Sequence, residues 1–180
     1  GLIQAFFPLY PLSIKYLNFI NNPLITGLLI STILSYLLFL SFYLFSKTFF
    51  KNNHWQNLLI FILFPTSFFF GAFYTESLFF ILVLQTFIQA HRKNWLWAGI
   101  LASLASATKV IGIILVPALL IEYFLENQTL TQFINNLIKN KSRKKLISSL
   151  RNKINLKSIR PIFLITIGSI GLFSYMSYLW

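Results

Sequence analysis

The sequence has no cysteine, no aspartate, only three glutamates and only two histidines. The absence of cysteine excludes disulfides and thiol chemistry. Because the side chains that bind transition metals are so few, we expect no metal site, and no cofactor is identifiable from the residues. Charged residues make up 10% of the chain, whereas soluble domains have about 25%. A soluble fold is therefore not expected.

Long hydrophobic runs occupy the chain instead. Of the 180 residues, 57% are hydrophobic, and several runs approach the ~20 apolar residues that a membrane-spanning helix needs. We expect an all-α, polytopic transmembrane helical bundle with about six membrane segments, forming a single partial domain over 1–180. Its location would be the plasma membrane of a bacterium or archaeon, or the endoplasmic reticulum of a eukaryote. The runs lie at about 24–46, 55–73, 76–90, 96–124 and 161–180.

Positive charge is concentrated between the hydrophobic runs. The net charge is +12, and most of the lysines and arginines lie in 127–160. In a soluble protein this excess would suggest nucleic acid, but between apolar runs it indicates a cytoplasmic loop on an anionic lipid leaflet. Apolar residues recur there at helical spacing, which predicts amphipathic interfacial helices. A solvated basic loop is the alternative. We expect membrane lipids as partners and no nucleic acid.

The basic clusters also predict a topology. The positive-inside rule places three of them on the cytoplasmic side: 127–160, 91–93 and 47–54. Segments 55–91 and 94–125 must then be out-and-back hairpins, with outer tips at 74–76 and 109–112. A single long helix over 96–124 is the alternative, but it would place the 91–93 cluster outside. The proline-broken segment 1–22 is expected on the outer side.

Two charges interrupt the apolar sequence, at Glu76 and Lys109. A charge within a membrane span is expensive and indicates a functional site. The hairpin topology brings both to the outer face. Lys109 offers three donors and a positive charge for a lipid-anchored phosphate, and Glu76 could bind a sugar hydroxyl, accept a proton or pair with Lys109. Tyr74, Thr75 and Ser77 add hydroxyls. The alternative is an ion pair that only docks the two hairpins.

Four sequence motifs, in order, resemble the PIG-V-type mannosyltransferases over about residues 6–123. They are F-P-L-Y-P at 7–11, F-P-T-S at 64–67, Y-T-E-S at 74–77 and A-G-I-L-A-S-L-A-S-A-T-K-V-I-G at 98–112. The resemblance implies a GT-C fold with its active site on the non-cytoplasmic face. It also implies inverting transfer of a sugar, typically mannose, from a polyprenyl- or dolichyl-phosphate donor.

The chain departs from this family in two ways. The basic residue that follows Ala-Thr is more often arginine in the family, and here it is Lys109, which lacks the bidentate fork of arginine. The family also carries an acidic residue, usually aspartate, in an outer loop ahead of the F-P-L-Y-P motif. Because the sequence begins at Gly1 and ends at Trp180 inside an apolar run, we expect a fragment whose catalytic Asp lies upstream of Gly1. The catalytic residue is therefore unknown, and the piece is expected to be inactive alone.

Two other classes of function suit parts of the pattern. Short helices with charges in mid-membrane also occur in transporters and flippases, although no inverted repeat is visible. A non-catalytic membrane scaffold would use Glu76 and Lys109 only as a pair, so exchanging the two charges would restore its function.

Overall fold

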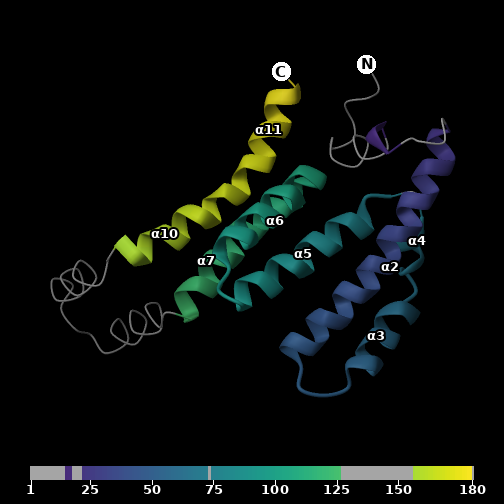
Figure 1. The fold of residues 1–180 in the computed structure, drawn as a ribbon, viewed down its shortest axis with the longest axis horizontal. Coiled ribbons are helices and arrows are strands. Elements are labelled where there is room, and N and C mark those ends of the chain that lie inside the picture. Colours follow the sequence, from purple (N-terminus) through teal and green to yellow (C-terminus); the bar gives the residue numbers. More distant parts are fainter. Residues whose placement is uncertain (1–14, 18–21, 73, 127–155, 180) are drawn as a thin grey trace.

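The computed structural model describes residues 15–17, 22–72, 74–126 and 156–179, which contain helices and no strand (Figure 1). The expected all-α class is confirmed for these residues. The F-P-L-Y-P motif and most of the basic loop lie outside them, so the predictions for 1–14 and 127–155 stay predictions.

The long helix α2 (Pro23–Phe49) has 27 residues. Its N-terminus is capped by Asn22, whose side chain accepts hydrogen bonds from the backbone N–H groups of Leu24 and Ile25, and Pro23 occupies a favourable first position. By length and composition, α2 is the one helix among the described residues that could cross a membrane, and the other apolar helices are shorter. The number of membrane segments therefore stays a prediction.

The predicted run at 55–73 is split in two by Pro65. The helix α3 (His54–Leu63) stops because Phe64, which precedes the proline, has an extended backbone (φ −62°, ψ 133°). The single-turn helix α4 (Phe68–Gly71) follows. The ring of Phe61 stacks on Phe42 at a centroid distance of 4.1 Å, which packs α3 against α2.

The next helix, α5 (Glu76–His91), runs parallel to α2. Two contacts fix this direction. The amide of Gln85 donates to the hydroxyl of Ser41 at 3.2 Å, and farther along both helices the rings of His91 and Phe49 meet at 5.0 Å. Because Phe49 contacts His91, the loop after α2 lies at the same end of the bundle as the 91–93 basic cluster.

The segment after α5 is an antiparallel hairpin that turns at Lys109. At its open end, the ring of Trp95 packs edge-on against Tyr123 at 5.2 Å. The two-helix interpretation of 96–124 is therefore correct, and the single long helix is wrong. The hairpin comprises α6 (Trp95–Thr108), the 3₁₀ turn η2 (Val110–Ile114) and α7 (Leu115–Glu126).

The small residues of α6 allow the last helices to approach closely. A Cβ on Gly171 would lie 1.8 Å from the backbone oxygen of Ser103, and the hydroxyl of Ser106 donates to the Gly168 carbonyl at 3.0 Å. Small residues at these positions thus permit close helix packing. These last helices run parallel to α6 as α10 (Leu156–Thr166), η3 (Ile167–Ser169) and α11 (Ile170–Leu179).

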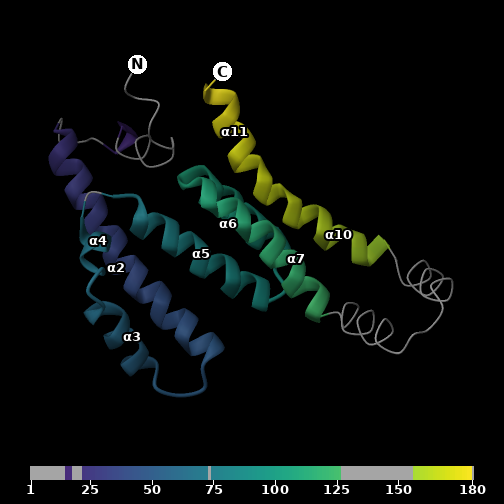
Figure 2. The same cartoon turned by 180° about the vertical axis from the view of Figure 1, so that it is seen from behind.

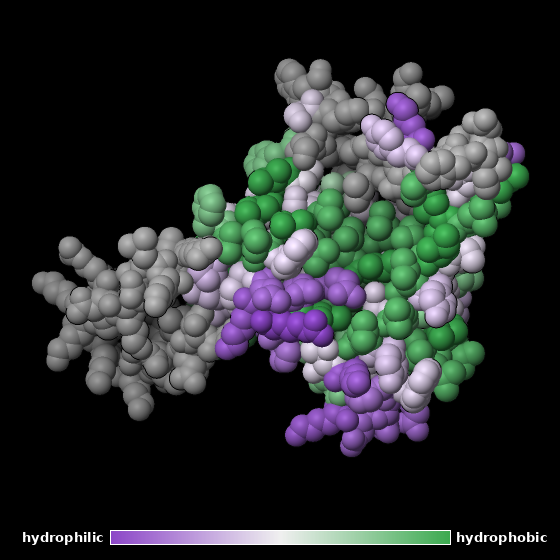
Figure 3. All heavy atoms as spheres, viewed as in Figure 1, coloured by the Kyte–Doolittle hydropathy of each residue, from purple (hydrophilic) through white to green (hydrophobic). Residues whose placement is uncertain are grey.

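The helices lie side by side in the order α3, α2, α5, α6 and α10–α11, as both views show (Figures 1 and 2). The short helix α4 contacts both α2 and α5. The hydrophobic core lies between α5, α6, α7 and α10 and includes Ala98, Ala102, Leu119 and Ile165. Many large apolar side chains on the outer helices are exposed, Leu24, Tyr36 and Phe173 among them. Figure 3 shows this apolar surface, with hydrophilic surface over the α2–α3 loop and the α5–α6 turn.

Candidate functional site

An ion pair joins the two charges that interrupt the apolar sequence. The Nζ of Lys109 lies 2.7 Å from the Oε1 of Glu76, so the lysine donates a hydrogen bond to the carboxylate. The side chains are 33% and 27% exposed, respectively. The pair is therefore accessible at one edge and not sealed in the core. It lies at the end of the bundle opposite the 91–93 cluster, because α5 begins at Glu76 and ends at His91.

The backbone explains why Lys109 sits at the tip of the hairpin. Helix α6 ends at Thr108, and Lys109 is extended (φ −150°, ψ 141°). The N–H of Gly112 then donates to the Lys109 carbonyl at 2.9 Å. A Cβ on Gly112 would lie 2.5 Å from the backbone of Ala105, so the return of the chain at this point requires glycine.

Glu76 is positioned by the start of α5. It lies in the first helical turn, where the partial positive charge of the helix end favours a carboxylate. Its Oε1 faces Lys109, whereas its Oε2 is buried and has no hydrogen-bond partner among the described residues. A buried carboxylate oxygen normally accepts a hydrogen bond, so this half of the carboxylate still needs a donor.

Phe79 is a further member of the site, and it was not predicted from the sequence. The Nζ of Lys109 lies 5.8 Å from the centroid of its ring, within the range of a cation–π contact. Phe79 follows Glu76 by three residues on α5, and residues at this spacing share a helix face. That spacing is the signal that could have identified it. The ring gives the ammonium group an apolar support that positions it beside Glu76.

The three predicted hydroxyl residues have different surroundings. Tyr74 is exposed, and its ring packs edge-on against Phe69 at 5.8 Å. Thr75 is half-buried, precedes α5 and makes no side-chain capping bond.

The sequence predicted that Ser77 would add a hydroxyl to the site, but in the structure this hydroxyl is engaged elsewhere. It is buried, and its hydroxyl donates to the backbone carbonyl of Phe70, which the hydroxyl of Ser35 on α2 also contacts. A buried hydroxyl that is engaged in this way joins α2, α4 and α5. The structure therefore gives Ser77 a packing role, while Tyr74 and Thr75 precede Glu76 in the chain.

The arrangement presents a cationic group, which can bind an anion, at a partly open edge. One of the three donors of Lys109 is directed at Glu76, and the others are available to an anionic oxygen. Over the described residues, no group of three or more His, Cys, Asp or Glu side chains is placed to hold a metal ion. Comparisons with protein-family models, with curated proteins and with solved structures found no match to this chain.

Proposed function

We propose that this chain is part of an integral-membrane glycosyltransferase of the GT-C type. It transfers a sugar, most simply mannose, from a polyprenyl- or dolichyl-phosphate donor to an acceptor hydroxyl on the non-cytoplasmic face. The observation that carries the proposal is the Glu76–Lys109 pair, partly exposed and at the opposite end of the bundle from the basic clusters. The order of the four sequence motifs supports the same family.

The membrane location is supported by two features of the structure. Helix α2 is long and apolar enough to cross a bilayer, and large apolar side chains on α2, α3, α7 and α11 are exposed. Exposed apolar surface of this extent is typical of contact with lipid or with further protein. The loop after α2 and the 91–93 cluster share one end, as expected for cytoplasmic loops that follow the positive-inside rule.

In the proposed site, Lys109 binds the phosphate of the donor. The acceptor oxygen forms a bond to the anomeric carbon while the bond from that carbon to the phosphate oxygen breaks. Negative charge then develops on the departing lipid phosphate, which the ammonium group of Lys109 stabilises. The proton of the acceptor goes to a base that we assign to none of the described residues, since the resemblance implies an aspartate and the sequence has none.

Glu76 has the complementary role in this proposal. Its paired oxygen, Oε1, orients Lys109. When the donor binds and exposes the buried Oε2, that oxygen accepts a hydrogen bond from a hydroxyl of the sugar. Tyr74, which is exposed beside Phe69, would close the side of the sugar site.

Ligand binding tests this proposal without requiring catalysis. Radiolabelled dolichyl phosphate mannose is bound to the purified chain in micelles, and Lys109→Ala is compared with Lys51→Ala. Loss of a charge-assisted hydrogen bond should weaken binding about tenfold or more. Lys51 lies at the other end of the bundle, so Lys51→Ala should bind as the wild type does. Equal binding by all three proteins would refute the assigned site.

A scaffold is the second candidate, and the same ion pair favours it. The contact joins the start of α5 to the tip of the α6–α7 hairpin, which is what a purely structural link would do. The two candidates differ in one respect: a structural link needs only opposite charges at the two positions, whereas phosphate binding needs the positive charge at position 109.

A further inference from the structure

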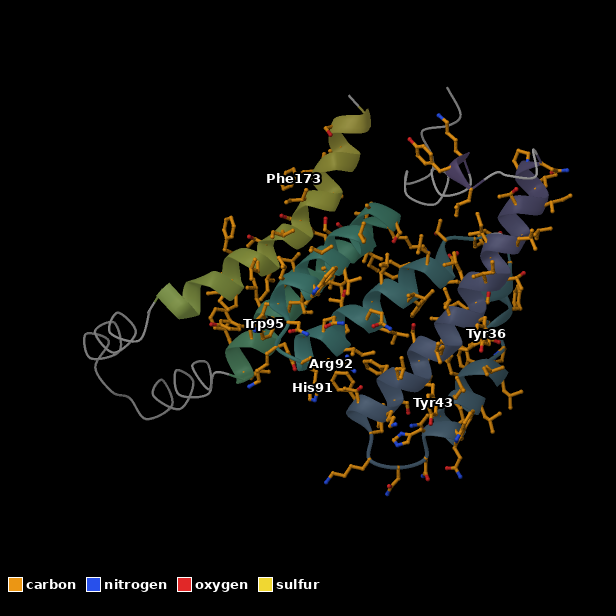
Figure 4. All side chains as sticks on the ribbon, viewed as in Figure 1. Tyr36, Tyr43, His91, Arg92, Trp95 and Phe173 are labelled. Carbon is orange, nitrogen blue, oxygen red and sulfur yellow. The ribbon has the colours of Figure 1, made fainter. Side chains whose placement is uncertain are left out.

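An open hollow of about 640 Å³ lies at the end of the bundle away from the Glu76–Lys109 pair. The turn 93–97, between α5 and α6, forms one side, and Pro161 and Leu164 of α10 form the other. None of these residues belongs to the site proposed above. Figure 4 shows His91, Arg92 and Trp95 close together at this end, where α5 stops and α6 starts.

The backbone of the turn holds Lys93 in an unusual conformation. Its φ is +64°, in the left-handed region that favours glycine. The N–H of Lys93 donates to the Ala90 carbonyl at 2.8 Å, and the N–H of Asn94 donates to the Gln89 carbonyl at 2.9 Å. This is the Schellman pattern of helix termination, whose left-handed position is usually glycine. A lysine there is held by the surrounding structure, and residues held in this way often have a functional role.

The two sides of the hollow differ in polarity. Lys93 and Asn94 give it a polar edge, and the side-chain amide of Asn94 is fixed by donation to Gln89 at 3.1 Å. The exposed side chains of Leu96 and Trp97, with Pro161, give it an apolar wall. Tryptophan beside basic residues is typical of the level at which lipid headgroups meet hydrocarbon.

Charge at this end is predominantly positive. His91, Arg92 and Lys93 are consecutive and exposed, and α7 brings two acidic residues to the same end, Glu122 and Glu126. Lysine near a membrane surface attracts anionic lipid. A ligand that is anionic at one side and apolar at the other therefore matches the hollow.

We propose that this hollow binds the headgroup of an anionic glycerophospholipid. The phosphate contacts Lys93 and Asn94, and the glycerol and upper acyl chain lie along Trp97 and Pro161. The proposal rests on the membrane location and is independent of sugar transfer at the opposite end. Failure of donor binding at Lys109 would leave this lipid site in place.

The experiment measures thermal unfolding of the full chain in dodecyl maltoside micelles, with increasing phosphatidylglycerol or phosphatidylcholine. A lipid that binds the folded state raises Tm, and the dependence on lipid gives an apparent Kd. Phosphatidylglycerol should raise Tm more than phosphatidylcholine. Lys93→Gly should weaken the phosphatidylglycerol Kd about fivefold. Without lipid it should be at least as stable as the wild type, because glycine suits φ +64°.

Two controls decide between a site and diffuse attraction. Lys51→Gly removes the same charge at the same end of the bundle but outside the hollow. Its Kd for phosphatidylglycerol should stay within about twofold of the wild type, because a screened charge at a distance contributes little to binding. If Lys93→Gly folds poorly, Lys93→Asn replaces it, because asparagine also tolerates the left-handed region. Wild-type binding by the folded Lys93 variant, or an equal loss in Lys51→Gly, would overturn the proposal.

Discussion

The Nζ of Lys109 lies 2.7 Å from the Oε1 of Glu76, although 33 positions separate the two residues in the chain. The contact exists because α6 ends one residue before Lys109, and the chain returns through Gly112, which packs on the backbone of Ala105. The same turn places the ammonium group over the ring of Phe79. A positive charge is thus held at the edge of an otherwise apolar bundle.

Removing one member of this pair should destabilise the protein more than removing both. Lys109→Met leaves an unpaired carboxylate, and Glu76→Gln leaves an unpaired ammonium group. Each should lower the free energy of unfolding by about 1–3 kcal/mol, less than for a fully buried pair because both side chains are partly exposed. Unfolding in mixed detergent micelles measures these values. A double variant that is less stable than either single one would contradict this prediction.

The ring of Phe79 should contribute measurably to the position of Lys109. Phe79→Leu keeps an apolar side chain but removes the cation–π contact, and should cost about 0.5–1 kcal/mol beyond the packing change. The same loss should be absent when Lys109 is already methionine, which a double-mutant cycle measures. A cycle with no coupling between positions 79 and 109 would show that the contact is incidental.

The close approach of α11 to α6 should make Gly171 intolerant of any side chain. Gly171→Ala puts a Cβ 1.8 Å from the carbonyl oxygen of Ser103, so the helices must separate, and we expect a loss of about 1–3 kcal/mol. Gly71→Ala is the matched control, because a Cβ there has no atom within 4 Å. Thermal unfolding of both variants tests this, and equal stability would contradict the packing described.

Single cysteines can test the arrangement of the two ends, because the chain has no native cysteine. Lys51→Cys and Arg92→Cys should react with a membrane-impermeant maleimide from one side of reconstituted vesicles. Tyr74→Cys should react from the other side. All three positions are exposed, so a lack of reaction would reflect sidedness and not burial. Labelling of Tyr74→Cys and Arg92→Cys from the same side would rule out the proposed topology.

Several features of the fold could be predicted from local sequence. Pro65 ends α3 through the extended Phe64, because proline restricts the backbone of the residue before it. The expected runs at about 24–46 and 76–90 also correspond to α2 and α5 in the structure. The break at Lys109 was one of two alternatives, and the positions of the basic clusters favoured it. These features depend on proline chemistry and on charge, both of which can be read from single residues.

Other parts of the site depend on contacts that leave little trace in the sequence. Ser77 was expected beside the ligand, but its hydroxyl donates to the backbone carbonyl of Phe70, and carbonyl groups carry no sequence signal. Phe79 was missed because aromatic residues are common throughout this chain, so one more at helical spacing did not stand out. The number of membrane segments depends on helix pairing, which hydrophobicity alone does not determine.

The exchange of the two charges separates a ligand site from a structural link most directly. In Glu76→Lys/Lys109→Glu the ion pair can re-form, so the unfolding midpoint should return most of the way from the single variants to the wild type. Some loss should remain, since a lysine at the start of α5 opposes the helix dipole. Binding of dolichyl phosphate mannose should stay at least about tenfold weaker than in the wild type, because position 109 is now negative. Recovery of both stability and binding would contradict the assignment of the donor phosphate to Lys109 and show that the pair is only a structural link.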